Sequence, residues 1–434
     1  MTTVSPGGAP PPAPAEATPA LSKARGRTFE ALGEPRYRRL WLMGAASFLA
    51  VNLQIIARGW LALELTGSNT GLGGVYLGFG IPMLLATPLG GVAADRLPKR
   101  PLLFACQALL ASTALWIGLA VAFDVVAYWM LVATSALQAV GFAFLGPARM
   151  AFTGELVGRD RLSNAVVLGQ LSLNGARVIG PAMAGILIGV PAVGTEGVYL
   201  IAATLTVVAC GVALTLPRGE PRAGRPVRSA GADLADGLSY VRRRPTLVAL
   251  LVTSFVVVMV AFPYVAFLPS VASDLFDVGS GGYGAMSAAS AVGAIAASLL
   301  IAGRANGAQA WRIQTWAGVA FGVTIVLLAV SPTLPIALLA IVGTGAAASA
   351  FQGMNNSLAL GLSDLEYHGR VQSLMMLSFS GFGMAALPLG ALADAIGLRQ
   401  TLVAMGVVTL LAMAAFVFLR PGGGGWAQED SRAR

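Results

Sequence analysis

The sequence predicts an all-α polytopic membrane protein with twelve transmembrane helices arranged in two bundles of six. Of its 434 residues, 56% are hydrophobic and only 11% are charged, and the mean hydropathy is +0.76. No soluble fold of this size buries so much apolar surface. The chain also offers twelve apolar runs of about 20 residues, the length that crosses a bilayer. A polar, arginine-rich segment separates the first six runs from the last six.

The predicted spans follow one another with short polar connections. The first six are expected at residues 40–66, 70–94, 102–123, 126–148, 162–190 and 197–216, and the last six at 247–272, 282–303, 309–331, 333–354, 369–395 and 400–419. The domains are then an N-terminal six-helix bundle at 37–216, a cytoplasmic linker at 217–245 and a C-terminal six-helix bundle at 246–420. Residues 1–36, rich in Pro and Ala, are expected to be a disordered cytosolic tail, and residues 421–434 a second cytosolic tail.

The basic residues predict the orientation, because cytoplasmic loops retain Lys and Arg. With both termini on one side, 25 of the 28 Lys and Arg fall on that side, and only Arg58, Arg177 and Arg399 lie elsewhere. Both termini are therefore expected in the cytoplasm, with the chain in the bacterial inner (plasma) membrane. The net charge of +9 then reflects topology and contact with the anionic inner leaflet. A nucleic-acid partner is not expected, since the sequence has no soluble basic module with aromatic residues.

A short charged hinge between the second and third spans is the most informative motif. It reads Gly91-x-x-x-Asp95-Arg96-x-x-Lys99-Arg100. This pattern resembles the loop between helices 2 and 3 of the major facilitator superfamily, G-x-x-x-D-[RK]-x-G-[RK]-[RK], with a proline here in place of the second glycine. The resemblance implies a transporter whose two bundles rock about a site near the midplane.

Further segments of the first half carry the same resemblance. They are YRRLWL at Tyr37, ARGWLALELTGS at Ala57, GPARMAFTGELVGRDRLSNA at Gly146 and NGARVIGPAMAG at Asn174. Together they resemble the branch that holds the enterobactin exporter and macrolide efflux proteins. Within them, Gly180-Pro181-x-x-x-Gly185 is similar to the fifth-helix signature of facilitator antiporters. Small residues at these positions let helices approach closely, and the proline bends the helix.

The resemblance gives the hinge charges a gating role. Asp95 ends the second span, where its carboxylate is expected to pair with a basic residue of the fourth span, Arg149 being nearest in kind, or to face a helix N-terminus of the other bundle. Arg96, Lys99 and Arg100 would hold the loop at the anionic inner leaflet. A solvated turn would explain the basic residues but not the acid at the end of the helix.

Polar residues inside the spans are candidates for the substrate path. Arg177 lies near the middle of the fifth span, where a lone guanidinium costs about 2.5–3.5 kcal/mol on insertion scales, and Arg58 lies in the outer half of the first span. Substrate contact and structural anchor stay equally open for Arg177, while the anchor is favoured for Arg58. Gln352, Asn355 and Asn356 share one face of the tenth span, although each alone could be a helix–helix hydrogen bond.

Proton coupling needs a carboxylate, and no acidic residue lies at the centre of a predicted span. Position favours Glu64 first and Asp394 second, although either could be an interfacial charge. The sequence PLGGVAAD at Pro88 is echoed by PLGALAD at Pro388. The two segments lie on spans that run in opposite directions, as inverted repeats do in transporters.

The remaining motifs exclude several classes of function. The chain has no G-x-x-x-x-G-K sequence, a single histidine and two cysteines inside spans, so we expect no nucleotide-driven pump, no metal site, no cofactor and no enzyme. We expect a monomeric secondary transporter that exports a small amphipathic molecule, a drug-like compound or a siderophore, by alternating access and proton antiport. A proton-coupled importer and a passive channel are the alternatives.

Overall fold

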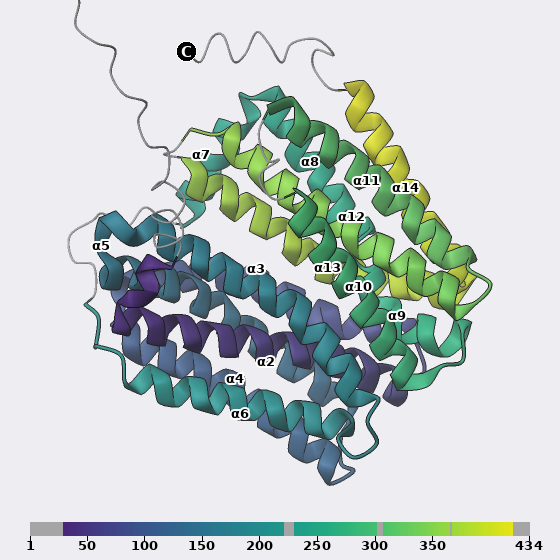
Figure 1. The fold of residues 1–434 in the computed structure, drawn as a ribbon, viewed down its shortest axis with the longest axis horizontal. Coiled ribbons are helices and arrows are strands. Elements are labelled where there is room, and N and C mark those ends of the chain that lie inside the picture. The colour runs from purple at the N-terminus through teal and green to yellow at the C-terminus, as the bar shows by residue number, and fades with distance from the viewer. Residues whose placement is uncertain (1–28, 221–229, 302–306, 365–366, 420–434) are drawn as a thin grey trace, which may run out of the picture.

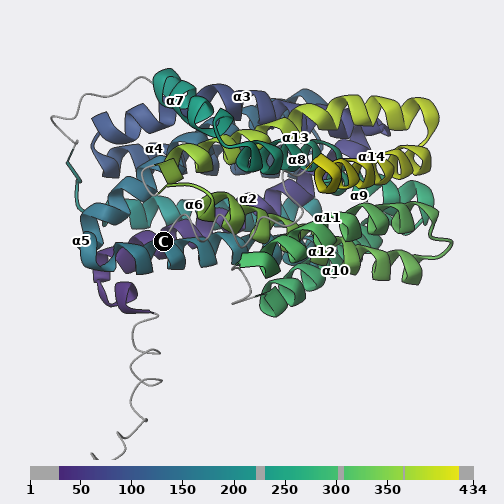
Figure 2. The same cartoon turned by 90° about the horizontal axis from the view of Figure 1, so that it is seen from above.

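The computed structural model describes residues 29–220, 230–301, 307–364 and 367–419. Within these ranges eleven helices are long and apolar enough to cross a membrane, and helices of both halves run side by side (Figure 2). α13 (His368–Ile396) takes the place of the eleventh predicted span, and its apolar part is described from Gly381 to Ile396. The predicted all-α polytopic fold is confirmed.

The first bundle contains α2 (Pro35–Thr66), α3 (Asn69–Arg96), α4 (Lys99–Ala122), α5 (Tyr128–Ile188) and α6 (Gly194–Leu214). α5 contains the fourth and fifth spans, which the structure places at Tyr128–Gly158 and Asn164–Ile188. They meet at Gly158, whose φ of 71° lies in the left-handed region that glycine adopts readily. A tight turn joins α2 to α3, because Gly67 ends α2 at a φ of 58° and the Ser68 hydroxyl caps α3 by accepting from the Gly71 N–H.

The second bundle contains α8 (Pro245–Val260), α9 (Tyr264–Ser270), the π-helical turn η2 (Val271–Leu275), α10 (Gly279–Ile301), α11 (Gly307–Val330), α12 (Leu334–Gly361), α13 and α14 (Leu398–Leu419). The seventh predicted span is built from α8, α9 and η2 together. The helix breaks between Val260 and Tyr264, where Pro263 has no N–H for the helical ladder.

Two spans continue farther than their apolar runs predict. The fourth reaches Gly158, where the prediction ended at 148, and the tenth reaches Gly361, where the prediction ended at 354. Polar side chains in the added turns make hydrogen bonds inside the protein. Thr153 donates to the carbonyl of Arg149 in the first extension, and Asn355 donates to the hydroxyl of Ser254 in the second.

The predicted disordered tail, residues 1–36, extends too far into the chain. Residues Glu30–Gly33 form a 3-10 helix, η1, and the N–H of the buried Ala31 donates to Oδ1 of Asn164 in α5 at 3.0 Å. Residues 29–36 therefore belong to the first bundle. Residues 1–28 of the predicted N-terminal tail and residues 421–434 of the predicted C-terminal tail lie outside the described residues. In the linker, α7 (Ala230–Arg242) packs against α8, α13 and α3.

The two bundles meet along two seams, α3 with α13 and α5 with α10. We call the end of the molecule with the α2–α3 turn and α9 the outer end, and the end with the α3–α4 connection and α7 the inner end. Figure 1 shows the bundles closest together at the outer end and diverging towards the inner end. Glycines bring the backbones together near the outer end: a Cβ built on Gly73 would lie 2.4 Å from the carbonyl oxygen of Ala386, and one built on Gly185 would lie 2.4 Å from Cα of Gly284.

Candidate gates and transport pathway

The α3–α4 connection carries the gating motif, and its acid is unengaged. α3 ends at Arg96 and α4 begins at Lys99. Asp95 is half-buried and makes no hydrogen bond or ion pair with any described residue. The expected pair with Arg149 is therefore absent in this conformation. A Cβ built on Gly91 would meet open space, whereas one built on its neighbour Gly90 would lie 2.3 Å from the carbonyl oxygen of Ala143 in α5.

Arg149 lies instead inside the first bundle. Its guanidinium carbon stands 4.6 Å from the ring centroid of Phe48 in α2, a cation–π contact. Gly44 leaves room for the side chain, because a Cβ there would lie 3.2 Å from Cδ of Arg149. Nε of Arg149 is buried without a hydrogen-bond partner. The aromatic ring thus stabilises the charge that the sequence led us to place beside Asp95.

Lys99 corrects a second expectation about the loop. Its side chain is fully buried, and Nζ donates to the carbonyls of Leu97 and Glu220 at 3.3 and 3.1 Å. Nζ also lies 3.8 Å from Oε1 of Glu155 in α5. Lys99 therefore ties the loop to the first bundle and does not reach the membrane surface. Arg96 is exposed, and the N–H of Arg100 donates to the carbonyl of Arg218.

Sequence reasoning missed Glu155, the acid that faces Lys99. It was overlooked because the fourth span was predicted to end at residue 148, which placed Glu155 in a solvated loop. The signal was available in the chain, since only two lysines occur in 434 residues and a buried one needs a compensating acid or carbonyls. Lys99 of α4 can face Glu155 only because the fourth span continues beyond residue 148.

Asp394 joins the two bundles at the outer end. Its Oδ1 accepts from the backbone N–H of Asn69 at 2.9 Å and from the Asn69 side-chain amide at 3.0 Å. Its Oδ2 accepts from the backbone N–H of Thr70 at 2.9 Å, from the Thr70 hydroxyl at 2.6 Å and from the Ser68 hydroxyl at 3.1 Å. The carboxylate thus caps the N-terminus of α3, where the helix dipole favours negative charge. Gly390 permits the approach, since a Cβ there would lie 2.2 Å from the carbonyl oxygen of Asn69. We call this contact the outer latch.

Asp394 was expected as the second candidate for proton coupling, and the structure places it in the outer latch. It ends the sequence PLGALAD, just as Asp95 ends PLGGVAAD. The two acids therefore occupy equivalent positions at the C-terminal ends of α13 and α3. In this conformation one is engaged at the outer end, and the other has no partner among the described residues at the inner end.

Glu64, the first candidate for proton coupling, lies beside a second outer contact. It is exposed and accepts from the indole N–H of Trp60, one turn earlier in α2. The Trp60 ring stacks on Tyr283 of α10 with centroids 5.9 Å apart, and the Tyr283 hydroxyl donates to the carbonyl of Ile56. Glu64 is thus connected through one hydrogen bond to an aromatic contact between the bundles.

Arg58 lies in the interior of the first bundle. Only 3% of its surface is exposed, and NH1 donates to the hydroxyl of Ser135 in α5 at 2.9 Å. Its Nε and NH2 have no hydrogen-bond partner. Such burial does not fit a residue of the substrate path, which must face accessible space. Its contacts are those of an anchor between α2 and α5.

Arg177 is exposed, in contrast to Arg58. It lies on α5 between Asn174 and Gly180. Of the fifth-helix signature, Gly180 faces α2, since a Cβ there would lie 2.4 Å from Cβ of Asn52, and Gly185 faces α10. Pro181 lies inside the helix between them. Substrate contact and structural anchor both stay open for Arg177.

The three amides of α12 separate into two environments. Asn355 is fully buried and donates to the Ser254 hydroxyl of α8 at 2.7 Å, a contact within the second bundle. Gln352 and Asn356 are half-buried, and Oε1 of Gln352 has no partner. The expectation that all three line the path is wrong for Asn355, whereas Gln352 and Asn356 remain candidates.

At the inner end, α7 is fastened to the second bundle. Arg244 binds Asp364 at 2.6 Å, and the Tyr240 hydroxyl donates to the same carboxylate. Partial burial raises the pKa of Tyr240 above its usual range. Arg370 of α13 binds Asp236 of α7 at 2.7 Å. Over the described ranges, no group of three or more His, Cys, Asp or Glu is placed to hold a metal ion.

Comparisons with known proteins identify the family. Residues 27–432 match the family described as Transmembrane secretion effector. The multidrug efflux pump Tap of Mycolicibacterium fortuitum is 26% identical over 377 residues, which cover 85% of this chain and 91% of Tap. Macrolide efflux protein A of Streptococcus pyogenes is 22% identical over 251 residues, 56% of this chain and 60% of that protein.

Solved structures of transporters share the fold. The nucleoside transporter NupG superposes with a TM-score of 0.69 at 15% identity, covering 89% of this chain and 99% of NupG. A bacterial homologue of the lysosomal transporter Spinster, in an inward-facing and occupied conformation, superposes with a TM-score of 0.70 at 15% identity and covers 88% and 96% of the two chains. The chain is thus a multi-pass membrane transporter that belongs to the major facilitator superfamily, in the branch of its efflux proteins.

Proposed function

We propose that this transporter exports a small amphipathic molecule, a drug-like compound or a siderophore, from the cytoplasm by alternating access driven by proton antiport. The observation that carries the proposal is the asymmetry of its two ends. Six hydrogen bonds join the bundles at the outer end, while Asp95 at the inner end has no partner among the described residues. This is the arrangement of a carrier closed to the outside.

The second state follows from the equivalence of the two acids. If the bundles rock until their inner ends meet, Asp95 reaches the N-terminus of α13 as Asp394 now reaches that of α3. Inverted repeats supply this symmetry in transporters. Because closing one end opens the other, only one latch is engaged at a time. A passive channel has no need for two exclusive latches.

Glu64 is the proposed site of proton coupling. When it gains a proton, the Trp60 N–H loses its charged acceptor, and a charge-assisted hydrogen bond becomes a weaker neutral one. Trp60 in turn stacks on Tyr283 of the other bundle. Protonation from the outside would therefore loosen the outer contact. The relatives named for multidrug and macrolide efflux support export as the direction.

The experiment has two steps. A strain hypersensitive to toxic compounds, expressing the protein, is screened for resistance to macrolides and other amphipathic drugs, and a deletion strain is assayed for siderophore secretion. Each positive compound is then added to everted vesicles. Uptake that saturates, shows counterflow and is driven by a lumen more acidic than the medium supports the proposal. Uptake that neither saturates nor shows counterflow indicates a channel, and accumulation in right-side-out vesicles under an outwardly acidic gradient indicates an importer.

A further inference from the structure

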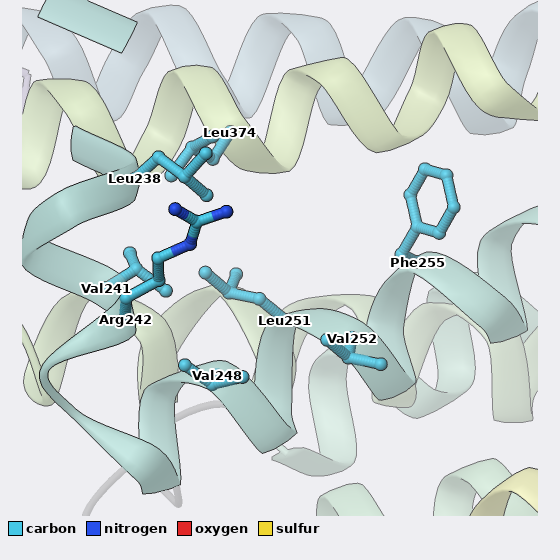
Figure 3. A pocket seen from close by; sticks show the side chains of 8 residues that line it. All are labelled: Leu238, Val241, Arg242, Val248, Leu251, Val252, Phe255 and Leu374. Carbon is cyan, nitrogen blue, oxygen red and sulfur yellow. The ribbon is translucent and has the colours of Figure 1, made fainter. Parts of the chain in front are cut away.

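An apolar groove opens at the inner end between α7, α8 and α13. It has a volume of about 370 Å³, and seven apolar side chains and one arginine line it (Figure 3). α8 contributes Val248, Leu251, Val252 and Phe255, which follow the i, i+3, i+4, i+7 spacing of a single helical face. One wall of the groove therefore follows the axis of α8.

One charged side chain stands at the inner end of this groove. Figure 3 shows the Arg242 guanidinium between Leu238 and Leu251. Two nearby cations are paired, Arg244 with Asp364 and Arg370 with Asp236, and Arg243 does not line the groove. Arg242 makes no hydrogen bond or ion pair with a described residue. The groove thus combines an apolar lining with one positive charge that has no described counter-charge.

The dimensions match one leaflet of a bilayer. Val248 and Phe255 are seven residues apart, so the stripe is about 10 Å long, most of the ~15 Å that half of the hydrocarbon core measures. α8 enters the membrane at Pro245, directly after Arg242 and its two neighbouring arginines. The cation therefore stands at headgroup depth and the stripe at acyl-chain depth.

We infer that the groove is a binding site for one anionic phospholipid of the inner leaflet, its phosphate at Arg242 and one acyl chain along α8. Basic pockets between transmembrane helices on the cytoplasmic side hold anionic headgroups in this way. The inference rests on the proposed orientation, in which α7 is cytoplasmic. Accessibility of a cysteine at Ser363 to an impermeant reagent tests that orientation by itself, so the two failures can be told apart.

Native mass spectrometry of the full chain in detergent tests the site. The protein is titrated with phosphatidylglycerol or with phosphatidylcholine of the same acyl chains. We expect the first phosphatidylglycerol to bind about five-fold more tightly than phosphatidylcholine, equivalent to the ~1 kcal/mol that one basic side chain contributes near an anionic surface. Arg242→Gln should remove this preference. Arg243→Gln, the same change on an adjacent exposed arginine that does not line the groove, should retain it.

Two further measurements separate the acyl chain from the headgroup. Val252→Trp fills the groove and should weaken the first binding event for both lipids, while thermal stability in detergent shows that the variant is folded. Soluble glycerol phosphate should not displace the lipid at equal concentration. The inference is overturned if both arginine variants lose lipid equally, if the two lipids bind alike, if Val252→Trp binds lipid normally, or if glycerol phosphate competes fully.

Discussion

Replacing Asp394 with asparagine should release the outer latch while preserving its shape. The carboxylate accepts five hydrogen bonds from the first turn of α3. An asparagine oxygen can still accept from the Asn69 backbone, but its NH₂ group faces the Thr70 N–H, a donor against a donor. The substitution thus removes at least one hydrogen bond and the charge that complements the helix dipole.

The magnitude follows from these losses. A hydrogen bond to a charged group contributes about 1.5–3 kcal/mol, and a neutral one about 0.5–1.5 kcal/mol. Because Asp394 is exposed, solvent reduces the electrostatic part, and we expect a net loss of about 1–3 kcal/mol. That corresponds to a shift of about 5- to 150-fold towards the outward-open state. Asp124→Asn, the same change on an exposed acid without a described partner, is the matched control.

Spin labels on cysteines at Val193 and Ser280 report the distance between the bundles at the outer end. Val193 lies in the α5–α6 connection and Ser280 in the first turn of α10, beside the α5–α10 seam. Asp394→Asn should add a longer-distance population by double electron–electron resonance, and Asp124→Asn should not. If the distance distribution of Asp394→Asn matches that of the unaltered protein, the latch does not hold the outer gate and the reasoning fails.

Four further outcomes are expected. Asp95→Asn should cut transport at least ten-fold at an unchanged level of protein in the membrane, and near-normal flux would remove the gating role. A cysteine at Val193 should react with an impermeant reagent from outside and one at Ser363 should not, whereas the reverse pattern would overturn the orientation. Lys99→Met leaves Glu155 without its partner and should reduce the free energy of unfolding by roughly 1–3 kcal/mol, which is measured as a lower melting temperature in detergent. Arg177→Met should abolish substrate binding at an unchanged melting temperature; retained binding with a lower melting temperature would make the arginine an anchor.

The spans were predictable because a bilayer imposes one simple constraint on every helix. A length of about 20 apolar residues is required whatever the neighbours are, so hydropathy finds each span without knowledge of packing. The inner ends of the fourth and tenth spans were underestimated for the same reason. Thr153 and Asn355 bond within the protein beyond the apolar run, and hydropathy does not register such bonds.

The partners of charged residues were much less predictable. The positive-inside count included Lys99 among the surface charges, because the count depends on sequence position and not on the direction of a side chain. The structure buries it. Asp394 and Thr70 are 324 residues apart, and no local pattern connects them. Only the echo of PLGGVAAD and PLGALAD pointed to a shared role, and it gave no indication of the helix that each acid would meet.

The two acids also set the balance between the conformations. Asp394 caps α3 when the outer end is closed, and in the proposed second state Asp95 caps α13 when the inner end is closed. If the two latches were equal in strength, removing both should leave the equilibrium near its original value, although each single change shifts it strongly. The double substitution Asp95→Asn with Asp394→Asn should therefore restore the distance distribution between the labelled outer positions towards that of the unaltered protein. If the double variant instead behaves like Asp394→Asn alone, Asp95 contributes nothing to the second state and the latches are not reciprocal.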